Sequence, residues 1–489
     1  ASFRNDWSST LTYADGSGDY TYSYPSVGVS WIATESLKNL PSWLSFGKLR
    51  ASLGYTGGDT DAWSTNNTGK YGPNGTFTQA DGSFVNLSGF KDNTLPNYGL
   101  KNRLARELEF GADIRFFNNR LGIDATVYNK ITKNEILSLN TTSESGVGSR
   151  IVNAGRIQNK GVEILLTATP VKTSKFEWNT SVNFSRNRNK VLELVEGTDT
   201  YTLSLGFGAD MSSVARVGKD YGTILTSYAF ARYESDNPAL NGQKVIGANS
   251  SAEGGIAYLR SGAYGQGTKE LGSVMEKFLA SNVNSFRYGN FTATVQADAK
   301  IGGMMASATH QYGSSYGAFA FTLPGRNTEL GGVTFTDASG NVRNDGIIPE
   351  GVLANGFKVL VDGQQKDLGG MSYADAVTAG YVKPIPAYQY YLNLTQWGSG
   401  IREYSTFENS WVALREVSIG YNVPAALISK AKIQSLRVSL VGRNLGYLYK
   451  TAKDGINPEG LYSNKAGEFM EYGGLPFSRN LGVSVSIGL

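Results

Sequence analysis

Few residues in this chain of 489 amino acids belong to types that catalyse reactions or bind metals. His310 is the only histidine and cysteine is absent, so the sequence offers no cluster of imidazole or thiolate ligands for a transition metal. General acid–base catalysis needs two carboxylates held in a water-poor cleft, whereas the acidic residues here are spread over strand faces and loops. We therefore expect no enzyme, no metal and no cofactor, and we interpret His310 as a loop residue.

The segment TDASGNVRNDG begins like a calcium-binding loop, because Asp337, Ser339 and Asn341 stand at the first, third and fifth ligand positions. The sixth position needs a glycine and holds Val342, and the twelfth needs a glutamate and holds Ile348. We therefore expect an ordinary hairpin in this segment and not a calcium site.

A second acidic segment, TGGDTDAW, contains Asp59 and Asp61 and is likewise interpreted as a turn. The formal net charge of the chain is +4, and no run of lysine or arginine marks a nucleic-acid surface. We therefore expect no nucleic-acid partner.

Aromatic residues in predicted loops are the remaining candidates for a binding site. Tyrosine and tryptophan rings stack on sugar rings or peptide side chains while their polar edges stay hydrated. Barrels also place these residues at both membrane interfaces, and loops use them to pack their own small cores. The candidates for contact with a transported substrate are Trp63, Tyr71, Tyr388, Tyr390, Tyr391 and Trp397.

The elements that carry these loops are predicted by an alternation of apolar and polar residues. In ELEFGADIRFF, the residues Leu108, Phe110, Ala112, Ile114 and Phe116 alternate with charged residues and glycine. The same period of two runs through the C-terminal segment RNLGVSVSIGL and makes one face of each strand apolar. The 60 Gly, 28 Tyr and 22 Phe against 13 Pro also favour strands and tight turns. A β-sandwich would give the same alternation.

The connections separate a barrel from a sandwich, because short and long ones alternate, as in transmembrane barrels. One short connection is a hairpin at Asn118 and Asn119, since asparagine tolerates the positive φ of a tight turn. Long outer loops are expected at 57–102, 303–410 and 449–478. No apolar stretch is long enough for a transmembrane helix. We therefore predict an all-β protein, a transmembrane antiparallel β-barrel with long extracellular loops.

Eleven strands are placed by the alternation and a twelfth by parity. The eleven are expected near 3–13, 25–33, 48–56, 104–116, 121–136, 151–169, 176–190, 287–300, 411–421, 436–448 and 480–489. The direction of the flanking strands requires an odd number between 191 and 286, most simply one strand within 212–234.

Several segments resemble the outer-membrane transporters of the SusC type, in the order in which that family carries them. They are YSYPSVGVSWIATESL, KLRASLGYTGG, RELEFGADIRFFNNRLGIDATVYNK, NAGRIQNKGVEILL, NSWVALREVSIGYNVP, LRVSLVGRNL and GINPEG. The resemblance implies a barrel of about 22 strands around an N-terminal plug. Residues 1–489 would supply its C-terminal part, about the last twelve strands, with 303–410 as a long extracellular loop region. The plug and the first strands would lie outside this chain.

The resemblance also implies a function and partners. It implies a TonB-dependent active importer of oligosaccharides or oligopeptides in the cell outer membrane. Expected partners are a SusD-like surface lipoprotein that closes over the outer mouth, the TonB complex acting through the plug, and outer-membrane lipid. A dimer of transporter–lipoprotein pairs is also considered, and 303–410 is expected to make the principal contact with the lipoprotein. Two alternatives stay open: a passive porin without a plug, and a secreted β-rich glycan-binding protein.

Overall fold

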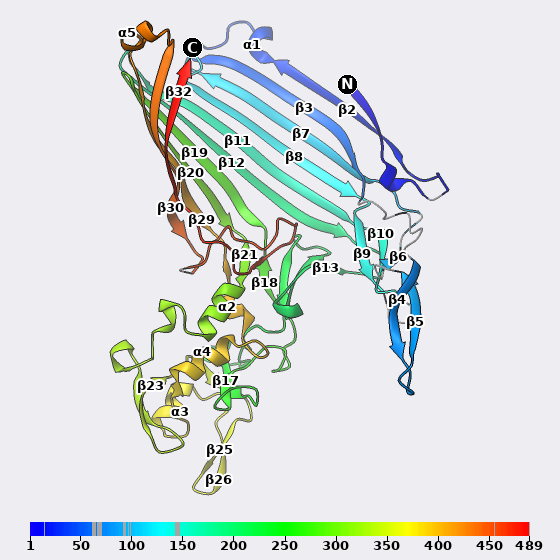
Figure 1. Ribbon diagram of the computed structural model, residues 1–489, viewed down its shortest axis with the longest axis vertical. Helices are drawn as coiled ribbons and strands as arrows, with labels where there is room; N and C mark the ends of the chain where they lie inside the picture. Colours follow the sequence, from blue (N-terminus) through cyan, green and yellow to red (C-terminus); the bar gives the residue numbers. More distant parts are fainter. Residues whose placement is uncertain are drawn as a thin grey trace.

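The computed structural model describes residues 1–13, 15–60, 65, 71–90, 94–95, 97, 99–141, 147–453 and 455–488. Its main element is one antiparallel sheet of twelve strands in chain order, which curves like part of a barrel wall (Figure 1). These strands are β1 (Ser2–Trp7), β2 (Thr21–Ile32), β3 (Leu44–Gly58), β7 (Arg103–Phe116), β8 (Leu121–Lys133), β11 (Arg156–Lys172), β12 (Phe176–Glu193), β19 (Glu276–Tyr288), β20 (Phe291–Gly302), β29 (Trp411–Asn422), β30 (Ser435–Lys450) and β32 (Asn480–Gly488). Because β1 and β32 are the two edges, the chain forms part of a barrel, and the all-β prediction is confirmed.

Short connections lie at one end of the sheet, where both chain ends also lie (Figure 1). The predicted hairpin between β7 and β8 is present, with φ of 54° at Phe117, 55° at Asn118 and 63° at Asn119. Two longer connections at this end carry the short helices α1 (Ala33–Ser36) and α5 (Ala425–Ile428). The long connections leave from the opposite end, so the predicted alternation is confirmed.

The two faces of the sheet differ in chemistry. Apolar residues pair across five neighbouring strands in one row, which runs through Leu49, Ala112, Ala125, Ile164 and Phe184. Residues that pair directly across antiparallel strands lie on the same face, so this face is continuous and apolar. In β7 it carries the apolar residues of the predicted alternation, Leu108, Phe110, Ala112, Ile114 and Phe116.

The opposite face is polar and is bonded across strands. Arg50 Nη2 lies 2.5 Å from Asp124 Oδ1, and Ser52 Oγ donates to Glu109 Oε2 at 3.2 Å. A long connection folds back onto this face, where its Glu459 Oε1 lies 2.5 Å from Nη2 of Arg415 on β29. We therefore assign the polar face to the barrel interior and the apolar face to the outside.

The predicted position of the twelfth strand is wrong. Residues 212–234 contribute β14 (Met211–Arg216) and β15 (Thr223–Thr226) to a separate four-stranded sheet with β13 (Thr200–Gly206) and β18 (Lys269–Ser273). The twelfth strand of the wall is β19, and the strand expected at 287–300 begins only at Phe291.

Two asparagines on the outward face of β19 explain this error, since they interrupt the apolar alternation. Asn282 and Asn284 are satisfied by neighbouring side chains: Trp178 Nε1 donates to Asn284 Oδ1 at 3.0 Å, and Asn282 Nδ2 donates to Thr180 Oγ1 at 3.1 Å. The hydrogen bonds lower the cost of polar groups on an apolar face, but a hydrophobicity pattern does not reveal them.

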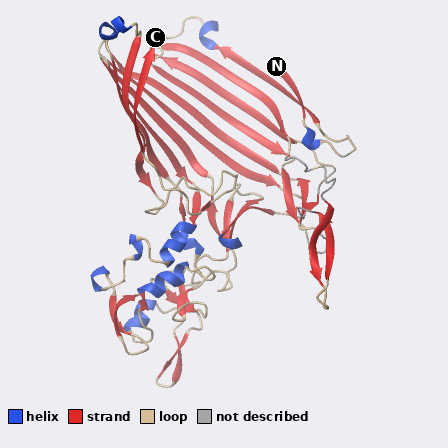
Figure 2. Cartoon of the chain, viewed as in Figure 1, coloured by secondary structure: helices blue, strands red, loops and turns tan. Residues whose placement is uncertain are grey.

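The long connections at 194–275, 303–410 and 451–479 fold together into a unit that we call the loop domain. Phe230, Ile246 and Tyr258 from the first connection pack in one hydrophobic core with Leu353 and Tyr373 from the second. The sequence analysis predicted long outer loops at 303–410 and 449–478 in this part of the chain. It missed the contribution of 194–275 to the loop domain. Most of the helical structure gathers in this domain (Figure 2).

The loop domain has three longer helices and several short strands. The helices are α2 (Ala308–Ser315), α3 (Tyr373–Thr378) and α4 (Ala387–Thr395). Its remaining strands are β16 (Val245–Ala248), β17 (Ile256–Tyr258), β21 (Met304–Ser307), β22 (Val333–Thr336), β23 (Val342–Ile347), β24 (Val352–Leu353), β25 (Lys358–Val361), β26 (Gln364–Asp367), β27 (Ile385–Pro386), β28 (Thr406–Glu408) and β31 (Met470–Glu471). In the part of the chain that the structure describes, no helix has the length and apolar character needed to cross a membrane.

A hairpin and a small sheet occupy the other long connections. The hairpin consists of β4 (Tyr71–Thr78) and β5 (Phe84–Phe90), and the sheet of β6 (Thr94–Leu95), β9 (Ile136–Asn140) and β10 (Ser149–Asn153). They lie at the same end of the wall as the loop domain but on the other side of the view, well apart from α2 and α4 (Figure 1).

Candidate functional site

Helix α4 carries three of the predicted aromatic residues. It begins after Pro386, whose φ of −52° suits the start of a helix. Ala387, Tyr391 and Leu394 are buried on one side of the helix, at the spacing of a helical face. Ala387 and Tyr391 also line a cavity, together with the more exposed Tyr388.

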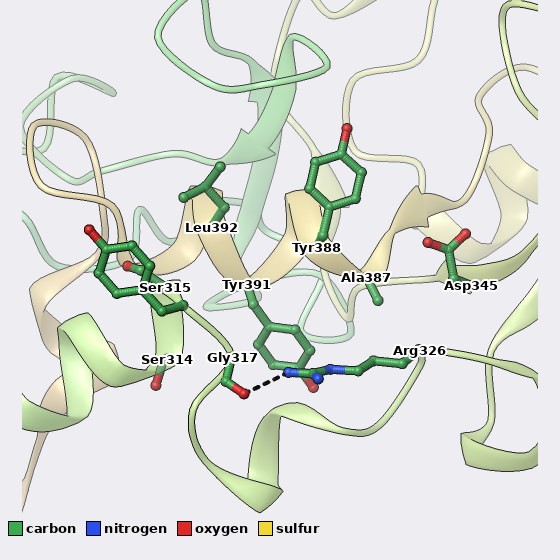
Figure 3. Close-up of a pocket in the computed structure, with 10 residues that line it drawn as sticks. Ser314, Ser315, Gly317, Arg326, Asp345, Ala387, Tyr388, Tyr391 and Leu392 are labelled. Atoms are coloured by element: carbon green, nitrogen blue, oxygen red, sulfur yellow. Dashed lines mark hydrogen bonds between the residues drawn. The ribbon is translucent and has the colours of Figure 1, made fainter.

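That cavity, which we call the α4 pocket, has a volume of about 400 Å³ and lies between α4, the end of α2 and β23 (Figure 3). Its lining combines three tyrosines with hydroxyl, guanidinium and carboxylate groups. The lining residues are Ser314, Ser315, Tyr316, Gly317, Arg326, Asp345, Ala387, Tyr388, Tyr391 and Leu392.

The charged groups of the α4 pocket are held in fixed orientations. Arg326 Nη2 donates to the carbonyl oxygen of Gly317 at 2.9 Å, and Nε donates to that of Thr322 at 2.9 Å (Figure 3). Asp345 accepts from Arg343 at both carboxylate oxygens, at 2.9 Å and 2.5 Å. Within the described residues, Nη1 of Arg326 and the second lone pairs of the Asp345 oxygens remain to bond a polar ligand.

Tyr388 is one of the residues that line this pocket, and it is 50% exposed. Its hydroxyl donates to Glu253 Oε1 at 2.9 Å and accepts from Gln389 Nε2 at 2.9 Å. Tyr391 is more buried, and its hydroxyl donates to the carbonyl oxygen of Pro324 at 3.1 Å. Tyr388 therefore has a half-exposed ring, with Cζ of Arg343 5.8 Å from its centroid, whereas Tyr391 mainly supports the wall.

A second cavity, of about 540 Å³, lies on the other side of Tyr391. Tyr390 lines it together with Tyr258 and Lys244. The ammonium of Lys244 lies 4.4 Å from the ring centroid of Phe230, and burial lowers the pKa of this lysine. In the described residues Lys244 forms no ion pair, and the cavity combines apolar and aromatic residues with this cation and the carboxylate of Glu350.

Two other predicted aromatic residues, Trp397 and Tyr71, do not line the α4 pocket. Trp397 is 56% exposed and stacks on Tyr312, with ring centroids 5.6 Å apart. Tyr71 lies on the β4–β5 hairpin, apart from the loop domain (Figure 1). Trp63 lies outside the described residues. The structure thus groups Tyr388, Tyr390 and Tyr391 on α4 and places Trp397 and Tyr71 outside the α4 pocket.

The interpretation of His310 as a loop residue is wrong, because it is buried on a helix, whereas Asp337 lies in a turn as expected. His310 lies on α2 and is buried against Phe321, with ring centroids 4.7 Å apart, and burial lowers its pKa to about 4. Asp337 Oδ1 accepts from the backbone N–H groups of Ser339 and Asn341, both at 2.9 Å, within the turn between β22 and β23. The predicted hairpin is therefore confirmed there. Asp61 lies outside the described residues, and Asp59 accepts from Ser8 Oγ at 2.8 Å.

Sequence reasoning missed the charged residues of the α4 pocket. Arg326 follows a Pro-Gly turn and Asp345 lies on β23. Neither residue belongs to a recognisable sequence motif. The one available signal was their position within the 303–410 region already rich in aromatic residues.

Comparisons with known proteins agree with this architecture. No family model matches the chain. It is 23% identical over 497 aligned residues to TonB-dependent receptor P3 of Formosa agariphila, covering 97% of this chain and 43% of that receptor. It is 25% identical over 373 residues to TonB-dependent receptor SusC of Bacteroides thetaiotaomicron, covering 72% of this chain and 36% of SusC. The solved structure of the RagAB peptide transporter matches with a TM-score of 0.64 at 17% identity, over 99% of this chain and 45% of that one.

The sheet and these relatives define the class: the chain corresponds to part of an outer-membrane β-barrel and is similar over nearly its whole length to TonB-dependent receptors. Within that class it is SusC-like, as the resemblance of its sequence motifs indicates. The chain spans less than half the length of these relatives.

Proposed function

We propose that the complete protein is an energised, TonB-dependent importer of oligosaccharides or oligopeptides, working with a SusD-like lipoprotein that closes its outer mouth. The observation that carries this proposal is the loop domain, which has its own hydrophobic core and still contacts the inner face of the wall through Glu459 and Arg415. A folded cap joined to the interior can guide a large substrate toward the barrel. The outer-membrane location excludes the alternative of a secreted glycan-binding protein. The other alternative, a passive porin, would be identified by uptake that does not depend on the proton-motive force.

The chemistry of the α4 pocket suits a polar cargo that carries sugar rings or amino-acid side chains. Tyr388 supplies an exposed ring, and Arg326 and Asp345 supply oriented polar groups. Aromatic stacking combined with planar hydrogen-bonding groups suits both sugar rings and peptides. We therefore keep both cargo classes in the proposal, with Tyr388 as the principal contact.

We assign the principal lipoprotein contact to residues 303–410. This region exposes large apolar side chains, among them Tyr316, Val342 and Leu360, which suits a surface that a partner covers. The alternative is a self-packed cap over the pore. The shared core with 194–275 gives such a cap its stability, but it leaves these side chains uncovered.

The test uses the complete protein expressed with its lipoprotein. Replacing Lys358–Asp367, the exposed β25–β26 hairpin, by a short glycine linker should leave the barrel assembled, because loops tolerate shortening. Lipoprotein pull-down and growth on the cargo should fall together. Shortening the β4–β5 hairpin is the matched control. Unchanged pull-down and growth after the first deletion would contradict the assignment.

A further inference from the structure

Five basic residues gather on the outward face of the wall, near the ends of strands β7, β11 and β12 that lead to the long connections. We call them the basic patch: Arg106, Lys160, Arg186, Arg188 and Lys190. All five are exposed. This face is opposite to the one that lines the interior, so the patch is separate from the proposed cargo route.

The strand register places these residues on the outward face. Arg186 and Arg188 follow Phe184 at intervals of two, so they share its face. Val162 pairs with Arg186, Lys160 with Arg188, and Gln158 with Lys190. In the same row Gln158 pairs with Ile131, which pairs with Arg106. The register therefore joins all five residues into one surface.

The basic patch is not neutralised by any carboxylate of the described residues. Among the described residues, none of its members forms an ion pair or a side-chain hydrogen bond, whereas Arg50, Arg115 and Arg415 on the inner face are all paired with carboxylates. The outward positions of β7, β8 and β11 hold no Asp or Glu, and neither do those of β12 as far as Lys190. The next outward acid on β12 is Glu193, which is already paired with Arg156 at 3.5 Å.

One pair in the patch is unfavourable by itself. Lys160 and Arg188 stand directly opposite each other across β11 and β12. Like charges at directly opposed positions of a sheet are destabilising. An external anion between the two side chains would convert this repulsion into attraction, so the arrangement suits a bound anionic group.

The depth of the patch identifies the source of that anion. The ten positions from Phe176, at the short-connection end, to Arg186 correspond to a rise of about 25 Å for a tilted strand, which is the height of the apolar band of such barrels. Arg186 thus lies at the outer border of the hydrocarbon, and Arg188 and Lys190 lie above it. Lipid headgroups occupy this depth.

We infer that the basic patch binds the phosphate groups of anionic lipid in the outer leaflet. Lysine and arginine clusters next to a membrane surface attract anionic headgroups through charge and hydrogen bonds. The apolar row below the patch, which includes Phe184 and Ile164, contacts the acyl chains of the same lipid. This inference does not depend on the cargo or on TonB.

The experiment uses the complete protein in zwitterionic detergent and the bisphosphorylated glycolipid lipid A as the probe. Bound lipid A is measured by native mass spectrometry for the parent and for Lys160→Gln/Arg186→Gln/Arg188→Gln. The triple variant should bind at least about tenfold more weakly, and dephosphorylated lipid A should bind the parent equally weakly. The matched control, Lys38→Gln/Lys172→Gln/Lys175→Gln, removes three exposed lysines at the other end of the wall and should bind like the parent.

Two results would overturn the inference. One is equal retention of lipid A by the parent and the triple variant. If lipid A retention is equal and the oligomeric state of the variant changes, the patch is a contact between copies of the protein. The other is equal binding of phosphorylated and dephosphorylated lipid A. If the triple variant does not fold, Arg188→Gln alone serves: it should raise the unfolding temperature in lipid-free detergent and lower lipid A binding, and a fall in both would contradict the role of the opposed pair.

Discussion

Arg402 and Asp210 are joined by an ion pair across 192 positions of the chain, with Nη2 of the arginine 2.8 Å from Oδ2 of the aspartate. The side chain of Arg402 is 0% exposed, and its Cζ lies 4.8 Å from the ring centroid of Phe207. Nη1 also donates to the carbonyl oxygen of Gln396 at 3.3 Å. This buried pair connects the first and second segments of the loop domain, so we treat them as one folding unit.

Replacing Asp210 by alanine should open the loop domain and leave the wall intact. A buried cation without its partner costs about 3–5 kcal/mol. Hydrogen exchange should increase in both 194–275 and 303–410, but not in β7, β8, β11 or β12. Glu270→Ala, which removes the exposed pair with Lys219 at 3.0 Å, is the control and should change little. Unchanged protection in Asp210→Ala would show that the two segments are joined without this pair.

Tyr388→Ala should weaken cargo binding without unfolding the loop domain. The ring is half exposed, so its loss removes a stacking surface and little of the core. We expect a loss of affinity of about five- to tenfold, measured by titration of the purified complete transporter with its cargo. Tyr462→Ala, an exposed loop tyrosine outside the α4 pocket, is the control. Equal affinities for the two variants would remove Tyr388 from the site.

Two adjacent leucines test the assignment of the faces. Leu166 pairs with Ile123 and Val182 on the outward face, whereas Leu165 pairs with Asp124 and Asn183 on the inner face. Leu166→Arg should destabilise the folded barrel by about 2–4 kcal/mol, because it places a charge in the lipid. Leu165→Arg should cost much less. Folding titrations of the complete barrel in lipid vesicles measure both values, and the reverse order would mean that the register is shifted by one residue.

The loop domain should lose stability as the pH falls from about 6.5 to about 4. His310 is buried beside Phe321, and burial lowers its pKa to about 4, so the unfolded state binds the proton more readily than the folded state does. Its contribution is fully present above pH 6.5 and decreases on acidification by up to about 3 kcal/mol. Protease sensitivity of the loop domain against pH checks this. His310→Asn should flatten the profile, and an identical profile would assign the acid sensitivity to other groups.

The sequence predicts the wall well because its signals are local. The alternation in β7 sets its faces, and Asn118 and Asn119 set the hairpin that follows it. The same reasoning misplaced the twelfth strand because Asn282 and Asn284 replace apolar residues there and are satisfied only by side-chain hydrogen bonds across strands.

The loop domain and its pocket were beyond such reasoning. Arg326 and Asp345 come to line the same cavity as Tyr388 through the packing of α2, α4 and β23. Phe230 and Tyr373 meet in one core although they lie 143 positions apart in the sequence. Neither contact produces a periodic pattern in the sequence. The local sequence can therefore suggest the aromatic residues, but it cannot predict the site that they form.

The most direct test of the proposed import function is the uptake of fluorescent oligosaccharides and oligopeptides, larger than passive porins admit, by cells that express the complete protein and its lipoprotein. Initial uptake is measured before and after a protonophore collapses the proton-motive force. An energised, TonB-dependent importer should lose uptake of its cargo class when the force collapses, and should regain it when the protonophore is removed. Uptake that continues unchanged without the proton-motive force would contradict the proposal and identify a passive porin.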